Sequence, residues 1–379
     1  MTNNIILTFN VGSSSLKIAC YQQQNCVFSV NIDLKKRHAQ WTGQTPPALK
    51  NWQIQGQLAT DACYLSHIVQ QHYATERVIA VHRIVHGGQY QQPIIIDKQV
   101  FAELERLAPL CPLHQPAALS VLKALQQQYP SMIHIAAFDT AFHGLHNALN
   151  YSYALPLALR QQGIRAYGFH GLSCQSIMLQ LHHHAPKHVM AKVLIAHLGN
   201  GSSITAVLDG VSQANSMGFS VLDGVPMGTR CGHLDAGVLL YLLTQGWNKE
   251  ALSHLLYQES GLLGLSGISS DMRELIKDAS AQAQFSIDYF CQRVAREIAS
   301  LATVIAGCDC LVFTGGIGEH QALVRTKILQ HLIWLGIDCD EQANQLNHMV
   351  ISKPSSTIKV LVLASNEQHQ LYLAAQDLI

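Results

Sequence analysis

The chain contains two similar patterns of apolar and polar positions, about half a chain apart. In each pattern an apolar, β-branched run leads into a short segment of small polar residues, and a second apolar run follows. The first pattern covers residues 5–19 and has Gly12 at its centre, and the second covers residues 193–207 and has Gly199 and Gly201. Such patterns predict β-hairpins. Glycine and serine at a hairpin tip leave N–H groups and hydroxyls accessible to an anion, so the duplication predicts a nucleotide clamp made of two similar halves.

Between and after these hairpins, short apolar runs alternate with segments of helical periodicity, which predicts an α/β fold. In the longest segment Phe290, Val294 and Ile298 recur every four residues, so one face of this helix is expected to be buried. Residues 31–57 are polar and contain two prolines, and we expect them to be rich in loops. The predicted strands are residues 78–81, 133–138 and 311–313, and the predicted helices are residues 100–107, 116–129, 236–245, 249–258 and 283–306.

A glycine-rich segment, Gly315 to Gly318, directly follows the predicted strand 311–313. It predicts a strand-to-helix turn that can bring backbone and a helix N-terminus against a nucleotide. Two better-known phosphate motifs do not match. The Walker A spacing fails because Lys17 is followed by Ile18 on a strand, and the dinucleotide fingerprint fails because its third glycine is missing.

Composition and charge restrict the class of protein. With 379 residues the chain exceeds what one hydrophobic core normally supports, so two domains are expected. The formal net charge is zero without long Lys or Arg runs, and no apolar stretch approaches the roughly 18 residues of a membrane span, so neither nucleic acid nor a membrane is an expected partner. The N-terminus lacks the layout of a signal peptide, and the ten cysteines lack the spacing of a disulfide framework or zinc site. We therefore expect a cytoplasmic protein.

Nine short motifs, found in one order along the chain, resemble those of the acetokinase family, the acetate kinases of the actin, sugar kinase and Hsp70 superfamily. They lie at residues 10–17, 82–88, 138–143, 167–171, 197–203, 227–230, 260–267, 269–273 and 314–319. The resemblance implies a two-domain, duplicated actin-like (RNase H-like) ATPase fold with an interdomain cleft that closes on nucleotide. It implies an N-terminal domain of residues 1–140 plus 369–379 and a C-terminal domain of residues 141–368.

The resemblance also implies an activity, which is reversible, Mg²⁺-dependent phosphoryl transfer from ATP to acetate that gives acetyl phosphate and ADP. Mn²⁺ is an alternative metal, and a homodimer is expected. Three other functions stay open at this point. One is a propionate or butyrate kinase of the same fold, the second is a nucleotide switch like actin or Hsp70 without kinase activity, and the third and most distant is a nicotinamide dehydrogenase.

The resemblance assigns site residues by group. The metal would be held by Asn10 and Glu367, and the catalytic residues would be Arg83, Asp139, His170 and Arg230. The acyl group would lie against Arg83, Val85, Leu113, Phe169 and Val221. ATP would contact Lys17, His197, Leu198, Gly199, Asn200, Gly201, Asp271, Met272, Arg273, Gly316, Ile317, Gly318, Glu319 and His320.

The chemistry of these residue types fits the implied reaction. A guanidinium can bind carboxylate or phosphoryl oxygens through two parallel hydrogen bonds, so Arg83 and Arg230 are suited to the acceptor and the transferred group. Members of the family are usually given an acid/base aspartate, here Asp139. A small carboxylic acid is ionised at neutral pH and has no proton to lose, so we expect Asp139 to act in the metal shell or to orient an arginine.

The chain departs from the family pattern in four segments. The departures are His233 and Ala236 in place of aspartate and proline, His320 in place of asparagine, Ala214 and Asn215 in place of aspartate and threonine, and Val221 in place of proline. Val221 is the departure that bears on the acyl group. A stiff, branched valine keeps the pocket small and apolar, so we expect acetate to be preferred and propionate to be accepted with a penalty.

Overall fold

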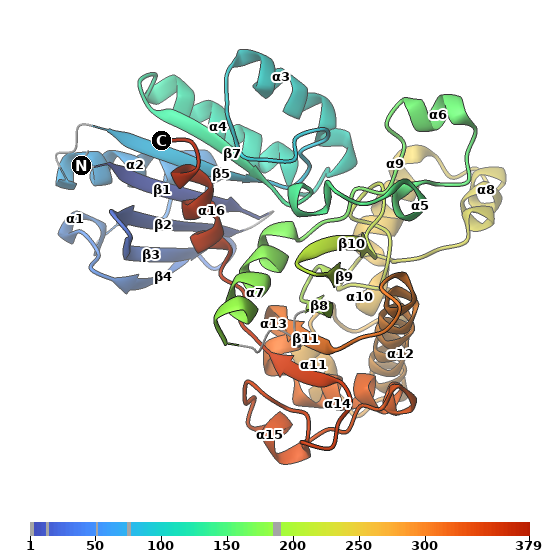
Figure 1. The fold of residues 1–379 in the computed structure, drawn as a ribbon. Helices are drawn as coiled ribbons and strands as arrows, with labels where there is room; N and C mark the ends of the chain where they lie inside the picture. Colours follow the sequence, from blue (N-terminus) through green and yellow to red (C-terminus); the bar gives the residue numbers. More distant parts are fainter. Residues whose placement is uncertain (1–3, 13–14, 51, 74–76, 185–190) are drawn as a thin grey trace. The chain divides into compact units, whose positions relative to one another are not determined.

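The computed structural model describes residues 4–12, 15–50, 52–73, 77–184 and 191–379. The chain forms two compact units (Figure 1). Unit 1 comprises Met1–Gly144 and Asn366–Ile379, and unit 2 comprises Leu145–Ser365. Each unit has its own sheet and its own hydrophobic core. Glu367 therefore belongs to unit 1, whereas the sequence analysis had placed it in the C-terminal domain.

Unit 1 is built on a seven-stranded sheet with the order β4-β3-β2-β1-β5-β7-β6. Strands β1 to β4 form an antiparallel meander, β5 and β7 run parallel to β1, and β6 pairs antiparallel at the far edge. The strands are β1 (Ile5–Val11), β2 (Ser15–Gln22), β3 (Asn25–Asp33), β4 (His38–Gly43), β5 (Val78–Ile84), β6 (Ile94–Ile95) and β7 (Ile133–Phe138).

Helices cover both faces of this sheet. Alternate residues of β1 point to opposite faces, and Leu7 and Phe9 join a core that includes residues of α2 and α4. Thr8 and Asn10 point the other way, where they contact residues of α16, the C-terminal helix that returns to unit 1 (Figure 1). The helices of unit 1 are α1 (Pro47–Lys50), α2 (Leu58–Tyr73), α3 (Lys98–Leu107), α4 (Gln115–Gln128) and α16 (Glu367–Gln376), with 3₁₀ turns at Ala108–Leu110 and Ala141–His143.

Unit 2 repeats the central topology of unit 1. Its five-stranded sheet has the order β10-β9-β8-β11-β12, in which β8, β9 and β10 form an antiparallel meander and β11 and β12 run parallel to β8. This order matches β3-β2-β1-β5-β7 of unit 1, so the duplicated fold predicted from the two hairpins is confirmed. The strands are β8 (Lys192–Leu198), β9 (Ser202–Leu208), β10 (Val211–Asn215), β11 (Cys310–Thr314) and β12 (Lys359–Val362).

The helices of unit 2 pack around this sheet, and α12 supplies the largest share of its buried helical side chains. They are α5 (Ala148–Tyr151), α6 (Leu157–Gln161), α7 (Gly171–His184), α8 (Ala236–Thr244), α9 (Lys249–His254), α10 (Gly261–Ser266), α11 (Met272–Lys277), α12 (Ala281–Val304), α13 (Gly315–His320), α14 (Ala322–Gln330) and α15 (Glu341–Gln345), with a π-helical turn at Leu255–Glu259 and a 3₁₀ turn at Ile333–Leu335. Among the described residues we find no helix with both the length and the apolar character that a membrane span requires.

Most predicted elements are present, and one prediction was wrong. The predicted helices correspond to α3, α4, α8, α9 and α12, although α9 ends at His254 and gives way to the π-helical turn. Residues 31–57, expected to be loop-rich, contain the end of β3, all of β4 and α1. Strand β4 lies at the edge of the sheet with most of its residues exposed, and its apolar alternation is limited to Ala39 and Trp41, which pack on the core, so the pattern is too short to stand out from the polar residues around it.

Candidate active site

Unit 1 brings four predicted site residues together at the carboxyl ends of its parallel strands. Asn10 lies near the end of β1, Arg83 near the end of β5, and Asp139 directly follows β7. Glu367 is the first residue of α16 and joins them from the face that this helix covers. Strands β1, β5 and β7 are neighbours, and ligands of α/β sheets commonly bind where such strands end.

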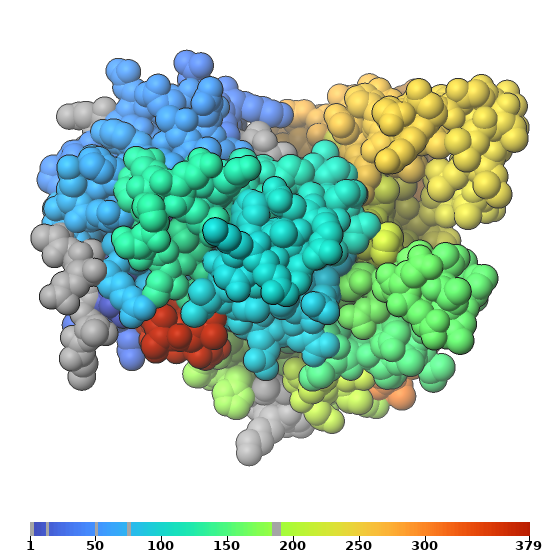
Figure 2. All heavy atoms as spheres, turned by 90° about the horizontal axis from the view of Figure 1, so that it is seen from above, coloured from blue at the N-terminus to red at the C-terminus, as the bar shows by residue number. Residues whose placement is uncertain are grey.

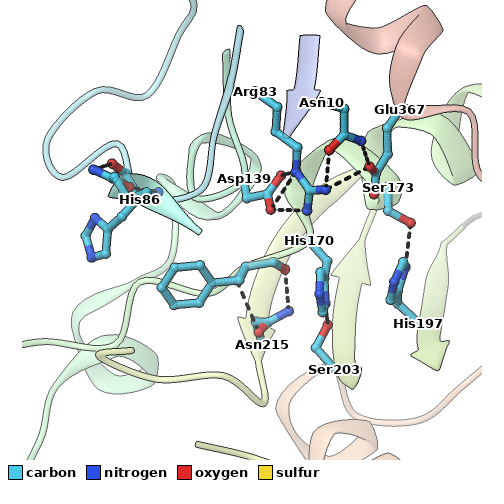
Figure 3. Close-up of polar contacts among 12 residues, drawn as sticks. Asn10, Arg83, His86, Asp139, His170, Ser173, His197, Ser203, Asn215 and Glu367 are labelled. Atoms are coloured by element: carbon cyan, nitrogen blue, oxygen red, sulfur yellow. Dashed lines mark hydrogen bonds and ion pairs between the residues drawn. The ribbon is translucent and has the colours of Figure 1, made fainter. Parts of the chain in front are cut away.

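Arg83 is the centre of this group (Figure 3). Its Nε donates to Asp139 Oδ1 at 3.0 Å and its NH2 donates to Asp139 Oδ2 at 2.6 Å, which makes a bidentate pair. Its NH1 donates to Asn10 Oδ1 and to Glu367 Oε2, both at 3.0 Å. Asn10 Nδ2 also donates to Glu367 Oε2, at 2.6 Å. Arg83 is therefore fixed from three sides by three different elements.

These contacts use most of the donors of Arg83. A guanidinium has five N–H groups, and the bonds to Asp139, Asn10 and Glu367 occupy four of them. One NH2 hydrogen is left after the contacts seen among the described residues. Asp139 already accepts the two parallel hydrogen bonds that Nε and NH2 of Arg83 can donate. The expectation that Arg83 binds a substrate through two parallel hydrogen bonds therefore does not apply to this arrangement. Arg83 offers a fixed positive charge and one further donor.

The electrostatics of this group follow from its burial. Burial alone would lower the pKa of Arg83, but the carboxylates of Asp139 and Glu367 raise it above its ordinary value, so the guanidinium stays charged. Burial raises the pKa of Asp139, while the bidentate Arg83 opposes that rise and Glu367 adds to it. The short bonds from Arg83 to both carboxylate oxygens are those of an ionised pair.

Unit 2 carries a second group of predicted site residues, at the β8–β9 hairpin. The rings of His170 and His197 stack with their centroids 4.2 Å apart. His170 Nδ1 lies 2.8 Å from Ser203 Oγ, and His197 Nδ1 lies 2.8 Å from Ser173 Oγ (Figure 3). Because each Nδ1 is engaged by a hydroxyl, the orientation of both rings is set by the hairpin and by α7.

His170 has an unusual backbone. Its φ of 58° lies in the left-handed region, which is uncommon for residues other than glycine and is found often at functional sites. Asn215 fixes the residue before it, because Asn215 Oδ1 accepts from Phe169 N at 3.4 Å and its Nδ2 donates to Phe169 O at 3.2 Å (Figure 3). Asn215, which stands where the family usually has threonine, thus holds the segment that carries His170.

The tip of the β8–β9 hairpin lies against the side chains of Arg230 and His170. A Cβ atom on Gly201 would lie 2.6 Å from NH2 of Arg230 and 3.2 Å from Nε2 of His170. Arg230 is buried, and its NH1 donates to the carbonyl of Val221 at 2.8 Å. Arg230, His170 and the backbone of the tip are thus in close contact, which suits a site for phosphoryl oxygens. The equivalent tip of the first hairpin, Ser13 and Ser14, lies outside the described residues.

The glycine-rich turn reaches the same hairpin. Gly315 has a φ of +78°, and a Cβ atom there would lie 2.7 Å from the carbonyl oxygen of Leu198, so only glycine fits. Glu319 Oε1 accepts from Gly315 N at 2.9 Å and steadies the start of α13. Gly316 has open space where its Cβ would be. The turn therefore presents accessible backbone next to the end of β8.

Sequence reasoning did not find the residue that fixes the other end of α13. Arg325, on α14, is fully buried, and its NH1 donates to the carbonyls of Gly318 and Glu319 at 2.8 and 3.0 Å. Its other donors bond to Asn344 and Asn347. A single arginine in a helical segment gives no signal of such a role. Ser173 and Ser203 were missed similarly, although Ser203 lies within a recognised motif.

The residues predicted to contact the adenosine differ in how exposed they are. Asp271 caps α11 by accepting from Arg273 N at 2.9 Å, and the two side chains form an ion pair at 2.6 Å on the surface of unit 2. This pairing lowers the pKa of Asp271. Met272 is buried in the core of unit 2. His320 is exposed at the end of α13.

The residues predicted for the acyl group are divided between the units. In unit 1 Val85 is buried and Leu113 is half-buried. The backbone after Val85 is clamped by Gln115, which accepts from His86 N and donates to His86 O. In unit 2 Phe169 and Val221 are both buried. Lys17 is exposed on β2, opposite Asn10 in the first hairpin.

The unit 1 group also has the donor atoms that Mg²⁺ prefers. Mg²⁺ binds oxygen, keeps several waters and commonly takes one or two carboxylates together with substrate phosphates. Asn10 Oδ1 and the carboxylates of Glu367 and Asp139 are oxygen donors drawn together by one guanidinium. The residues therefore fit such an ion. Among the described residues no cluster of three or more His, Cys, Asp or Glu side chains forms an all-protein metal cage.

Comparisons with known proteins agree along nearly the whole chain. A model of the family described as the acetokinase family matches residues 5–373. The chain is 39% identical to the acetate kinase of Methylocella silvestris over an alignment that covers 96% of this chain and 95% of that protein. It is 40% identical to the acetate kinase of Rickettsia felis, with coverage of 96% and 97%.

Solved structures agree with this. The acetate kinase of Entamoeba histolytica superimposes with a TM-score of 0.86 at 29% identity, covering 99% of each chain. A propionate kinase of Francisella tularensis superimposes with a TM-score of 0.84 at 32% identity, covering 100% of each chain.

Proposed function

The chain belongs to the acetokinase family, and we propose that it transfers the terminal phosphoryl group of ATP to acetate, giving acetyl phosphate and ADP, and that it also catalyses the reverse reaction. The observation that carries this proposal is the fixed guanidinium of Arg83 at the carboxyl ends of β1, β5 and β7. A nucleotide switch has no anionic acceptor for such a charge to serve.

In the proposed reaction an oxygen of the acetate carboxylate attacks the γ-phosphorus of ATP, and the bond from that phosphorus to the bridging oxygen of ADP breaks. The carboxylate has no proton to lose, so the reaction needs no general base. It needs positive charge on the phosphoryl oxygens and a fixed acceptor, because positioning and electrostatics supply most of the catalysis in phosphoryl transfer. We assign these tasks to Arg230 and Arg83.

We propose that His170 donates a hydrogen bond to the transferred group. Its Nδ1 is engaged by Ser203 Oγ, and its Nε2 is turned toward the hairpin tip at Gly201. When Ser203 donates to Nδ1, the hydrogen of the neutral ring is on Nε2, the atom beside the tip. Asp139 has a positioning role, since it accepts the two parallel hydrogen bonds from Nε and NH2 of Arg83.

We propose that Mg²⁺ is held by Asn10 and Glu367, with Asp139 nearby, and that Mn²⁺ can replace it. When bound, the ion neutralises phosphate charge and orients the phosphates for in-line transfer. ATP is expected to contact the backbone of the β8–β9 tip and of the turn that begins at Gly315.

We also propose that the protein is a homodimer that uses helix α8. This helix has the sequence AGVLLYLLT, yet none of its residues is buried, and Leu240, Tyr241 and Leu243 are at least half exposed. A contiguous apolar surface of this kind marks an interaction site. A cytoplasmic location is proposed as well, because all ten cysteines are free, as is usual in a reducing compartment.

One similar structure is a propionate kinase, so the candidates for this chain are an acetate kinase and a propionate kinase. The preferred acid decides between them. We propose acetate as the better substrate, since Val85, Phe169 and Val221 are apolar side chains that are all buried. Acyl phosphate formation should be measured as the hydroxamate with acetate, propionate and butyrate. We expect kcat/KM to fall from acetate to propionate by a factor of ten to a few hundred, because one methylene is worth roughly 1–3 kcal/mol, and to fall again for butyrate. A rise along this series would favour the longer-chain kinase, and no acyl phosphate from any acid would reject the kinase proposal.

A further inference from the structure

Unit 1 has a hollow that the proposed reaction does not use. It has a volume of about 590 Å³ and lies between α3, the end of α4 and strand β7, and we call it the α3–α4 pocket. Figure 2 shows the surface that α3 and α4 form on this side of unit 1. Its volume falls in the range of small-molecule sites. Phe101, Tyr129 and Met132 form its apolar walls, and His134 lines it from β7.

His134, which lines this pocket, has a buried side chain. The side chain is 4% exposed, and its Nδ1 lies 3.1 Å from Nε2 of His82 on the neighbouring strand β5. The other nitrogen, His134 Nε2, is buried and has no hydrogen-bond partner among the described residues. Buried polar atoms are nearly always paired, so an unpaired nitrogen beside a pocket marks a place for a ligand atom.

The charges around the pocket favour an anion. Lys98 and Lys123 line it from α3 and α4, and the single acidic residue of the lining, Asp97, already accepts from Val100 N as the cap of α3. Burial lowers the pKa of His134 to about 4, so its ring is neutral at pH 7 and carries one hydrogen. When His82 donates to His134 Nδ1, that hydrogen is on Nε2, which makes it a donor.

We propose that the α3–α4 pocket binds a small organic carboxylate with an apolar or aromatic body. The carboxylate accepts a hydrogen bond from His134 Nε2 in the field of Lys98 and Lys123, and the body packs against Phe101. Because Nε2 is covered in the protein without ligand, binding requires the side chains above it to move, and we expect a modest affinity.

The pocket is connected to the group around Arg83 by adjacent residues. The ring of His82 stacks on Phe9 with centroids 5.1 Å apart, and both rings lie on the face of the sheet that His134 shares. Phe9 directly precedes Asn10, and His82 directly precedes Arg83. A ligand that fixes the tautomer of His134 also fixes that of His82, and we expect this to change the affinity for the acceptor. This consequence rests on the proposed function, whereas the binding itself does not.

Benzoate is a suitable probe, with benzyl alcohol as its uncharged counterpart. Calorimetry on the full chain, with saturating acetate and Mg-ADP to keep benzoate from the proposed acceptor site, should show one benzoate site and no comparable binding of benzyl alcohol. We expect Lys123→Met and His134→Phe each to weaken benzoate binding by about tenfold or more, because each removes a charge or donor from the carboxylate. Lys36→Met, an exposed lysine of unit 1 outside the pocket, is the matched control and should not change it.

Two results would overturn the proposal: no benzoate binding at all, or binding that neither variant weakens. Lys123 is exposed, so its variant remains informative even if His134→Phe does not fold. The coupling is tested separately by the KM for acetate with and without benzoate. We expect benzoate to change this KM in the wild type and not in His134→Phe; an equal effect in both would be competition at the acceptor site and would reject the coupling. A chain without acetate kinase activity would reject the proposed function and leave the binding result intact.

Discussion

Among single residues, Arg83 is the one whose surroundings define its task most sharply. Lysine would keep the charge but lose the planar fork, and it cannot serve Asp139, Asn10 and Glu367 together. We therefore expect Arg83→Lys to lower kcat/KM for acetate by about 100-fold or more, since loss of one such contact costs roughly 3 kcal/mol, with little change in the KM for ATP. Hydroxamate kinetics measure this, and circular dichroism checks the fold.

Arg106→Lys serves as a matched control for that measurement, because Arg106 is exposed on α3 and takes no part in the group. It should behave like the wild type. If Arg83→Lys retained near-normal turnover, the planar guanidinium of Arg83 would have no role in the reaction.

The contacts of Arg83 also predict an effect of metal removal. Asn10 Oδ1 and Glu367 Oε2 now accept from NH1 of Arg83, and both are oxygens that we assign to Mg²⁺. With Mg²⁺ held by these oxygens, the NH1 hydrogens of Arg83 would lose two of their acceptors and could be donated to acetate instead. We therefore expect acetate to bind more weakly in EDTA than with Mg²⁺, even without nucleotide, as measured by calorimetry. Glu367→Gln should reduce this difference, and equal affinity under both conditions in the wild type would contradict the competition.

For the group around Arg83, the sequence identified the chemical groups but not all of their geometry. The family resemblance singled out Asn10, Arg83, Asp139 and Glu367, and the structure brings them together in unit 1. The sequence did not reveal that Asp139 accepts both parallel hydrogen bonds of Arg83, because such a pairing depends on strands far apart in the chain. The hydroxyl partners of His170 and His197 were missed for the same reason.

Among elements, prediction succeeded where burial left a period in the sequence. Helix α12 was found nearly to its ends because its apolar positions recur on one face and bury in the core of unit 2. Strand β4 was missed because its alternation is limited to two apolar residues, Ala39 and Trp41, in an otherwise polar edge strand. The glycine-rich turn was found from its composition, while the arginine that holds it, Arg325, was not.

The C-terminal end of helix α13 depends on Arg325. Arg325 is buried, and it holds the carbonyls of Gly318 and Glu319 while its other donors bind Asn344 and Asn347. Arg325→Lys cannot make all of these bonds, so the end of α13 should loosen. We expect the KM for ATP to rise by about tenfold, the KM for acetate to change little, and the melting temperature to fall, because a buried hydrogen-bonded network is costly to break.

Lys327→Arg is a suitable control, because Lys327 lies on the same helix and its surface ion pair with Asp288 can be kept by arginine. A variant of Arg325 that lost stability while both KM values stayed unchanged would show that its role is structural only.

For the molecule as a whole, the duplication could be derived from the two hairpins, but the path of the chain could not. The C-terminal segment from Asn366 returns to unit 1 and supplies Glu367 to the group around Arg83. The sequence analysis began this return at residue 369 and so assigned Glu367 to the other domain. A return of this kind leaves no local pattern, since it is determined by the packing of α16 on β1 and β5.

Both units bury neutral histidines, and this predicts how stability depends on pH. His82 and His134 in unit 1 and His146 in unit 2 are buried, and burial lowers the pKa of His134 and of His146 to about 4 and that of His82 well below its ordinary value. In the unfolded chain histidine titrates near pH 6.5. As the pH falls from about 6.5 toward 4, the unfolded chain binds protons that the folded chain does not, so stability decreases, by about 1.4 kcal/mol per pH unit for each histidine.

Urea unfolding between pH 7.5 and 5.5, above the range of most carboxylates, should show this fall in stability. His146→Gln should reduce the slope by about one proton, because the amide cannot be charged. Stability that stays level over this range would mean that the three rings accept protons without unfolding.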